Sequence, residues 1–122
     1  MHNTELPTAT EHLEQCAYFR WLDWAYPDVI AFAIPNGGLR SKATAGKLRA
    51  EGVKPGVPDI MLAEPLGAWP GLFVEMKSKR GVVSDAQKLM IARLRQKGYK
   101  VEVAYGWVQA KDVTEGYLKL GL

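Results

Sequence analysis

Apolar and polar residues follow one another along this chain at spacings that predict four helices and four strands. Apolar side chains recur at helical spacing through residues 8–26, and Pro27 closes that stretch. Further helices are expected at residues 41–51, 84–98 and 109–120. Short runs rich in strand-forming residues predict strands at residues 29–34, 59–63, 71–77 and 101–105. This order of elements indicates a mixed α/β architecture.

Turn-forming residues separate these segments and suggest how two of the strands meet. Residues 35–38, Pro-Asn-Gly-Gly, follow an apolar run that we expect to be a buried strand. Residues 64–70 contain two prolines and a glycine, which suits a hairpin connection. The strands at 59–63 and 71–77 are therefore candidates for antiparallel neighbours.

The length and composition suit one compact domain that spans residues 1–122. Hydrophobic residues make up 48% and charged residues 24% of the chain, which is ordinary for a folded protein in water. The single cysteine, Cys16, excludes an internal disulfide and a cysteine-rich zinc site, and we expect it to be a buried thiol. The sequence shows no targeting segment and no run long enough to cross a bilayer. We therefore expect a soluble, cytoplasmic protein with no membrane partner.

Positive charge is concentrated in the middle of the chain. Residues 40–100 carry 13 Lys and Arg against 5 Asp and Glu, whereas the remaining residues carry 3 against 8. This excess predicts a basic surface that could bind phosphate groups, although neighbours in sequence need not be neighbours in space. The candidates for such a phosphate track are Lys42, Lys47, Arg49, Lys54, Lys79 and Arg80. Any one of them could equally be an ordinary solvated charge.

Three residues that could carry chemistry lie on the two strands of the expected hairpin. Asp59 begins the first strand, Glu75 lies inside the second, and Lys77 follows on the same side of that strand. If the strands pair, Asp59 can approach Glu75 closely. Two carboxylates repel each other at short range unless a cation lies between them, and Mg²⁺ prefers oxygen ligands. The trio therefore predicts a metal site beside an amine that can assist a water molecule.

A simpler interpretation of the same residues is structural. Glu-x-Lys occurs on many strands as a surface ion pair, and Pro-Asp is common in turns. Glu75, however, interrupts the apolar run 72–76, where an unpaired charge is costly. This surrounding favours a functional site. The two histidines and the cysteine do not have zinc-site spacing, and the glycines match neither a Walker loop nor a dinucleotide fingerprint, so no nucleotide cofactor is expected.

Several motifs, in order over nearly the whole chain, carry a resemblance to a known family. They are Glu11-x-x-x-Gln15, Pro35-Asn36-Gly37-Gly38-x-Arg40, Gly52-Val53-x-x-Gly56-Val57-Pro58-Asp59, Glu75-x-Lys77 and Ser84-x-x-Gln87. Together they resemble a stand-alone virus-type replication-repair nuclease (VRR-NUC) domain, a branch of the PD-(D/E)XK superfamily. The resemblance implies a restriction-endonuclease-like α/β core, in which helices flank a mixed β-sheet.

The resemblance also implies roles for the residues on the two strands. Asp59 and Glu75 would bind Mg²⁺ or Mn²⁺, and Lys77 would assist the attacking water. The backbone carbonyl of Met76 is a further candidate metal ligand. Pro58 would support the site from the position before Asp59.

Residues on two helices are implied as well, with an alternative for each. Glu11 would reach the metal from the first helix, but it could instead form a capping box with Thr8, and Glu14 is the alternative ligand one turn away. Gln87 would point at the metal site, or it could close a capping box with Ser84 at the start of its own helix.

The remaining motif residues have roles that the resemblance implies, and each has an alternative. Gln15 would lie beside the site as a supporting residue, or it could be an ordinary half-buried polar residue. Asn36, Gly37 and Arg40 would form a loop that contacts DNA, because glycines allow close approach of the backbone and arginine binds phosphate. The alternative for this loop is an ordinary turn with a solvated arginine.

Together these observations predict a metal-dependent endonuclease that cuts branched DNA such as four-way (Holliday) junctions. The resemblance implies a homodimer that takes part in DNA repair in a bacterial or phage-infected cell. A sequence-specific restriction-type nuclease is one alternative, but a chain of this length has little room for a base-reading module, which favours recognition of shape. A non-catalytic DNA-binding module is the other, and it would have no chemical need for two carboxylates that face a phosphate.

Overall fold

The computed structural model describes residues 9–35 and 42–121 of the 122-residue chain. Its helices are α1 (Ala9–Ala25), α2 (Lys42–Ala50), α3 (Asp85–Gln96) and α4 (Trp107–Leu118), followed by a short 3-10 helix, η1 (Lys119–Gly121). Its strands are β1 (Ala31–Ala33), β2 (Ile60–Leu62), β3 (Leu72–Lys77) and β4 (Lys100–Tyr105). The expected order of elements and the α/β class are confirmed. Within the described ranges, none of the helices combines the length and apolar character that crossing a bilayer requires.

The four strands form one mixed sheet in the order β1-β2-β3-β4. β1 pairs antiparallel with β2, β2 pairs antiparallel with β3, and β3 pairs parallel with β4. A hairpin joins β2 to β3, as the prolines and glycine of that segment suggest. Within the connection, Leu66 and Trp69 form an isolated antiparallel β-bridge through two backbone hydrogen bonds. α3 makes the crossover from β3 to β4, because parallel neighbours cannot be joined by a tight turn.

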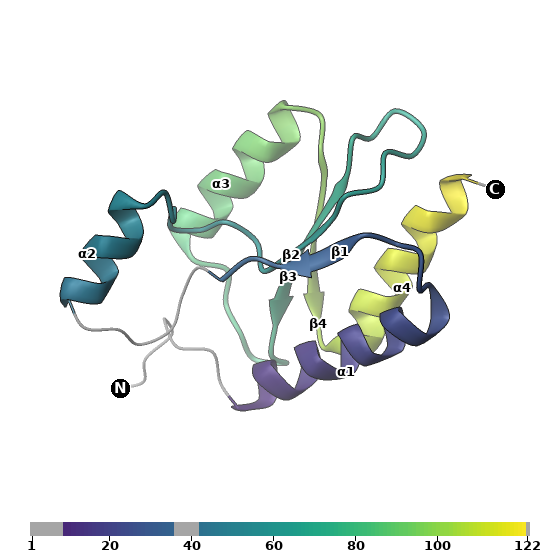
Figure 1. Cartoon of the computed structure of the whole chain (residues 1–122), viewed down its shortest axis with the longest axis horizontal. Helices are drawn as coiled ribbons and strands as arrows, with labels where there is room; N and C mark the ends of the chain where they lie inside the picture. The colour runs from purple at the N-terminus through teal and green to yellow at the C-terminus, as the bar shows by residue number, and fades with distance from the viewer. Residues whose placement is uncertain (1–8, 36–41, 122) are drawn as a thin grey trace.

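Helices cover both faces of the sheet, and the two cores differ in size. α1 and α4 pack side by side on one face, and α3 lies on the other over β4 (Figure 1). The larger core, under α1 and α4, contains Tyr18, Leu22, Ile60, Leu62, Leu72, Val74, Met76, Ala104, Ala110 and Tyr117. The smaller core, under α3, contains Phe73, Ile91 and Val101. Side chains alternate along β3, so Glu75 and Lys77 share the α3 side with Phe73.

The strand expected to be buried at residues 29–34 is instead a short edge strand. Only Ala31–Ala33 belong to β1, and Phe32 is 46% exposed. Ala31 packs against the larger core, whereas Phe32 lies opposite Met61 on the side of the sheet that α3 covers only at its far edge. The expectation of burial is wrong because an apolar run does not show which strand will form the edge of a sheet.

The outer surface of α1 carries Cys16 and Trp24. Cys16 is exposed, and its Sγ lies 3.6 Å from His12 Nε2, so the expectation of a buried thiol is wrong. Trp24 is 82% exposed. Tyr18 and Leu22 are buried on the opposite side of the helix. Two positions along a helix turn a side chain by about 200°, so burial of Tyr18 and Leu22 directs Cys16 and Trp24 outward.

α2 stands apart from the layers of the fold, at the left of Figure 1. None of its nine residues is buried. Its sequence, Lys-Ala-Thr-Ala-Gly-Lys-Leu-Arg-Ala, contains three cations and no acidic residue. The expected helix is therefore present, and it presents a positive surface to its surroundings.

A buried hydrogen bond between α1 and α4 gives a first testable prediction. The hydroxyl groups of Tyr18 and Thr114 lie 2.7 Å apart, and both residues are fully buried. Burial raises the pKa of Tyr18 to about 12, so its phenol stays protonated near neutral pH. Tyr18→Phe leaves the Thr114 hydroxyl without this partner, which should cost about 1–2 kcal/mol. Scanning calorimetry should show a Tm lower by roughly 3–8 °C.

The matched control replaces both polar groups. Tyr18→Phe combined with Thr114→Val leaves no orphaned hydroxyl at this place, so the double variant should lose less stability than the two single substitutions added together. Strictly additive losses would show that the two hydroxyls do not interact.

Candidate active site

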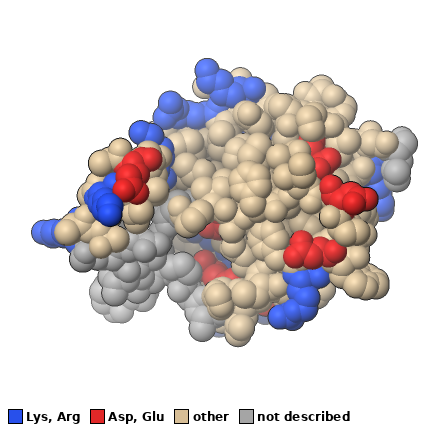
Figure 2. All heavy atoms as spheres, in the orientation of Figure 1, with Lys and Arg blue, Asp and Glu red and all other residues tan. Residues whose placement is uncertain are grey.

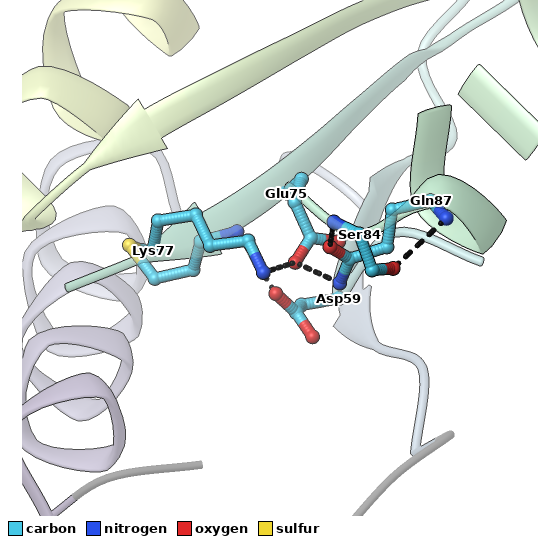
Figure 3. Close-up of polar contacts among 6 residues, drawn as sticks. Asp59, Glu75, Lys77, Ser84 and Gln87 are labelled. Carbon is cyan, nitrogen blue, oxygen red and sulfur yellow. Dashed lines mark hydrogen bonds and ion pairs between the residues drawn. The ribbon is translucent and has the colours of Figure 1, made fainter. Parts of the chain in front are cut away.

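The register of β2 and β3 places Asp59 opposite Glu75. Ile60 pairs with Val74, so the next residues along the two antiparallel strands face each other on the same side of the sheet. The sequence left this pairing conditional, and the structure contains it. Figure 3 shows the side chains of Asp59, Glu75 and Lys77 converging.

Regular pairing between β2 and β3 ends here, and the Asp59 carboxylate takes the place of a backbone acceptor. β2 begins only at Ile60, which pairs with Val74, whereas β3 continues beside β4 as far as Lys77. The backbone N–H of Met76 donates a hydrogen bond of 2.9 Å to Asp59 Oδ2. The backbone carbonyl of Asp59 accepts a bond of 2.7 Å from the N–H of Ile34. Asp59 is thus held through both its backbone and its side chain.

Glu75 and Lys77 are charged side chains in a buried place. Glu75 is 2% exposed and Lys77 is 7% exposed. Lys77 Nζ lies 3.6 Å from Glu75 Oε2, close enough for an ion pair. Glu75 Oε1 is buried and has no hydrogen-bond partner among the described residues. A buried carboxylate oxygen without a donor is costly, so this atom marks a place that a ligand would satisfy.

Gln87 takes both of the positions that its sequence allows. Its side-chain Oε1 accepts a hydrogen bond of 2.9 Å from the backbone N–H of Ser84. Its backbone N–H donates to Ser84 Oγ at 3.2 Å, and the two bonds together form a capping box on α3. Its Nε2 donates a bond of 2.9 Å to Glu75 Oε2 (Figure 3). The capping box uses the oxygen of the amide and thereby turns the nitrogen toward Glu75. The two interpretations of Gln87 are therefore compatible.

The electrostatics of the acidic pair follow from this burial. Burial, and after it the charge of Asp59, together raise the pKa of Glu75 to about 8, although Lys77 opposes the rise. Burial also raises the pKa of Asp59, against the hydrogen bond from Met76. A proton shared between the two carboxyl groups is the expected state near neutral pH when no cation is bound.

Of the two candidate acids on the first helix, Glu14 is bound to another helix, whereas the charge of Glu11 acts on Asp59. Glu14 Oε1 accepts a hydrogen bond of 2.7 Å from the backbone N–H of Trp107, the first residue of α4. Gly106, the N-cap of α4, has no side chain for this purpose, so Glu14 caps α4 from α1. Glu11 lies close enough to Asp59 for its charge to raise the pKa of that carboxyl group. The capping box considered for Glu11 involves Thr8, which lies outside the described residues.

The chemistry of the donors fits a hard divalent cation. The described residues contain no cluster of three or more His, Cys, Asp and Glu side chains close enough to hold a metal ion by themselves. Mg²⁺, however, is commonly held by one or two carboxylates and completes its coordination with water and substrate phosphate. Asp59 and the unpartnered Oε1 of Glu75 meet this requirement. Glu11 and the carbonyl of Met76 are additional candidates.

Other residues named from the sequence lie around this centre or away from it. Pro58 is buried and leads the chain into Asp59, and Gln15 is half-buried on α1. The cations proposed to contact phosphate are exposed on α2, in the segment after it and in the turn after β3; they are Lys42, Lys47, Arg49, Lys54, Lys79 and Arg80. Asn36, Gly37 and Arg40 lie outside the described residues.

Two glycines beside the site make contacts that the sequence did not predict: Gly56 was named only as part of a motif, and Gly81 was not named at all. Gly56 lies against the backbone of Ala86 and Gln87 at the start of α3, and Gly81 lies against the side chain of Lys77. Gly56 follows Pro55 and has a φ of +84°, as in a type II turn. The Pro-Gly pair was the available signal in the sequence, but it predicts only a turn and not what the turn contacts.

Comparisons with known proteins identify the family of the chain. A family model described as the VRR-NUC domain matches residues 11–107. A solved structure named "VRR_NUC domain protein" is 28% identical to this chain, with a TM-score of 0.77, and the match covers 95% of this chain and 93% of that one. No curated protein matches significantly. The match to the family model covers well over half of this chain, from the first helix through the acidic pair to the start of α4. The chain therefore belongs to the VRR-NUC family of nuclease domains.

Proposed function

We propose that this VRR-NUC domain is a metal-dependent endodeoxyribonuclease that hydrolyses phosphodiester bonds in branched DNA, such as four-way junctions. One observation carries the proposal more than any other. Asp59, which is half-buried, lies opposite the buried Glu75, and Glu75 Oε1 has no donor among the described residues. Such a pair is unfavourable without a cation or a shared proton, and phosphodiester hydrolysis requires positive charge at the reacting phosphate.

The proposed cofactor is Mg²⁺ or Mn²⁺. When bound, it would supply positive charge for the phosphate oxygens and lower the pKa of the attacking water. Asp59 and Glu75 would hold it, with Glu11 and the Met76 carbonyl as further ligands. Met76 and Gln87 fix the positions of the two carboxylates through the hydrogen bonds of their N–H groups.

Lys77 would act on the water and on the charge that develops in the transition state. Its Nζ lies 3.6 Å from Glu75 Oε2, and the residue is buried, so little solvent screens its charge. Three N–H donors on a flexible stem allow it to contact Glu75 and a water molecule at the same time. Two acids and an ammonium group are thus close together, an arrangement suited to the hydrolysis of a phosphodiester.

Exposed cations outside the site would hold the DNA backbone. Figure 2 shows Lys and Arg side chains gathered over α2 and over the upper end of α3. Lys42, Lys47 and Arg49 come from α2, and Lys79 and Arg80 from the turn after β3, which is the strand that carries Glu75. Phosphate contacts of this kind position DNA without reading its sequence. They favour recognition of DNA shape over recognition of a base sequence.

The proposed active unit is a homodimer. One chain has a single acidic pair of this kind among its described residues, and a four-way junction must be cut on two strands to be resolved. Two copies related by a two-fold axis would supply two such sites. The proposal of a dimer rests on this requirement and on the resemblance of the sequence motifs to the stand-alone members of the family.

The central prediction concerns cleavage. Purified protein with Mg²⁺ or Mn²⁺ should cut a labelled four-way junction faster than a linear duplex or a flap, and a chelator should stop the reaction. Asp59→Asn and Lys77→Ala should each lower the single-turnover rate by roughly 100-fold or more. Lys119→Ala, an exposed lysine in η1 that lies outside the proposed site, should cut like the wild type. Gel electrophoresis of end-labelled strands gives both the rate and the position of each cut.

Two outcomes of the same assay would contradict the proposal. Discrete cuts at fixed sequences in linear duplex would indicate a restriction-type nuclease. Binding without cleavage under any divalent cation would indicate a non-catalytic DNA-binding module.

Another prediction tests whether Glu11 or Glu14 takes part in catalysis. Glu11→Gln should lower the cleavage rate by roughly tenfold or more, because it removes a negative charge near Asp59. Glu14→Gln keeps an oxygen that can accept from the Trp107 N–H, so it should keep both the Tm and most of the rate. A larger loss of rate in Glu14→Gln than in Glu11→Gln would reverse the assignment.

A further prediction concerns how the stability of the metal-free protein depends on pH. The pKa of Glu75 is about 8 in the folded state, well above its ordinary value, and the pKa of Asp59 is also raised. The folded state therefore binds protons that the unfolded state releases, so its stability should fall as the pH rises from about 5 to about 8. With a chelator present, the Tm should decrease by roughly 10 °C or more over this range.

Glu75→Gln provides the control for this effect. The amide does not titrate, so the variant should lose most of the pH dependence that the wild type shows between these values. Parallel Tm curves for the two proteins would show that Glu75 does not titrate in this window.

A further inference from the structure

The turn before Asp59 lies directly on the first turn of α3. Gly56 has a φ of +84°, and a Cβ at this position would lie 2.3 Å from the carbonyl oxygen of Ala86 and 3.0 Å from the backbone nitrogen of Gln87. Both neighbours are backbone atoms and cannot rotate away. Only a residue without a side chain permits this approach, so the contact depends on glycine.

The contact meets α3 at the turn that carries Gln87, the residue that donates to Glu75. The buried or partly buried apolar residues that join α3 to the smaller core, Ile91 and Leu94, lie in its later turns. In the first turn, Gln87 reaches Glu75 through its side chain, and Gly56 touches the backbone beside it. The distance between this turn and β3 is therefore set in part by how closely Gly56 approaches.

The geometry indicates what a side chain at position 56 would do. A methyl group there would need to withdraw by about 1 Å to reach an ordinary contact distance from the Ala86 oxygen. If α3 gave way by that amount, the bond of 2.9 Å between Gln87 Nε2 and Glu75 Oε2 would exceed hydrogen-bonding distance. Glu75 would then lose one of the two groups that hold Oε2.

We propose that Gly56 is a positioning residue of the active site: its missing side chain seats the first turn of α3 so that the Gln87 amide holds Glu75. Gly56 itself touches neither carboxylate nor the reacting atoms. It acts through α3, and it links the segment that leads into Asp59 with the helix that supports Glu75. The consequence for cleavage rests on the proposed nuclease function, whereas the placement of Gln87 does not.

The chain offers a matched control in Gly52. Gly52 also has a positive φ, +106°, but nothing lies within 4 Å of where its Cβ would be. Alanine is strained at both positions by the backbone conformation. Gly56→Ala and Gly52→Ala should therefore both lose some stability, and only Gly56→Ala should disturb α3.

The first test uses the metal-free protein and no DNA. In ¹⁵N–¹H NMR spectra, the side-chain amide of Gln87 should give a shifted signal protected from exchange with water in the wild type and in Gly52→Ala. In Gly56→Ala this signal should move to the position of a solvated amide. An unchanged Gln87 signal in a folded Gly56→Ala protein would overturn the proposal, whether or not the protein cuts DNA.

The second test is a double-mutant cycle on the rate of DNA cleavage. Gly56→Ala should lower kcat by roughly tenfold or more with little change in KM, because it misplaces a group at the reacting centre. Gln87→Met removes the amide and should have a similar effect. In the Gln87→Met background, Gly56→Ala should cost less than about twofold more, since it acts through Gln87. If the fold losses in kcat of the two single variants multiply in the double variant, Gly56 acts by a route other than Gln87.

A milder variant covers the case in which Gly56→Ala does not fold. Pro55→Ala loosens the turn without adding an atom at the contact, so it should fold and should weaken the Gln87 signal and the rate in the same direction by a smaller factor. Full retention of both by Pro55→Ala, together with failure of Gly56→Ala to fold, would assign the contact to stability alone and overturn the proposal.

Discussion

The antiparallel register of β2 and β3 is the constraint on which the rest of the site depends. On one side of the sheet, Ile60, Leu62 and Val74 enter the larger core, and a slip of one residue would turn an entire strand face toward the opposite side. On the other side, the same register sets Asp59 opposite Glu75, which is unfavourable for two like charges. Burial of the apolar face therefore enforces the approach of the acids on the polar face.

The groups around the two carboxylates satisfy the acid pair's need for donors only in part, because one carboxylate oxygen of Glu75 is left without a donor among the described residues. Met76 donates to Asp59 Oδ2, and Lys77 and Gln87 both approach Glu75 Oε2. Glu75 Oε1 is left buried without a donor in the described part of the chain. A proton satisfies this arrangement only by neutralising an acid, whereas a divalent cation would interact with both acids at once. The proposed chemistry therefore follows from what the protein leaves unsatisfied.

Helices on both faces of the sheet support this centre. Glu14 caps α4 from α1, and Glu11 on the same helix acts on Asp59 through its charge. The capping box of α3 orients the amide of Gln87, and the close contact of Gly56 seats the turn that carries it. α2, which has no buried residue, remains outside these layers as a positive surface. Rigid elements thus hold the acids, while the exposed cations lie where DNA could reach them.

The sequence by itself determined the order of elements, the hairpin between β2 and β3, and the candidacy of Asp59, Glu75 and Lys77. These features depend on apolar periodicity, turn residues and spacing along one strand, which are local. Only the tertiary structure decided that β1 is an exposed edge, that Cys16 faces outward, that Glu14 caps α4, and that Gln87 bonds to both Ser84 and Glu75. Each of these outcomes depends on which distant segments pack together, and the spacing of residues along the chain does not contain that information.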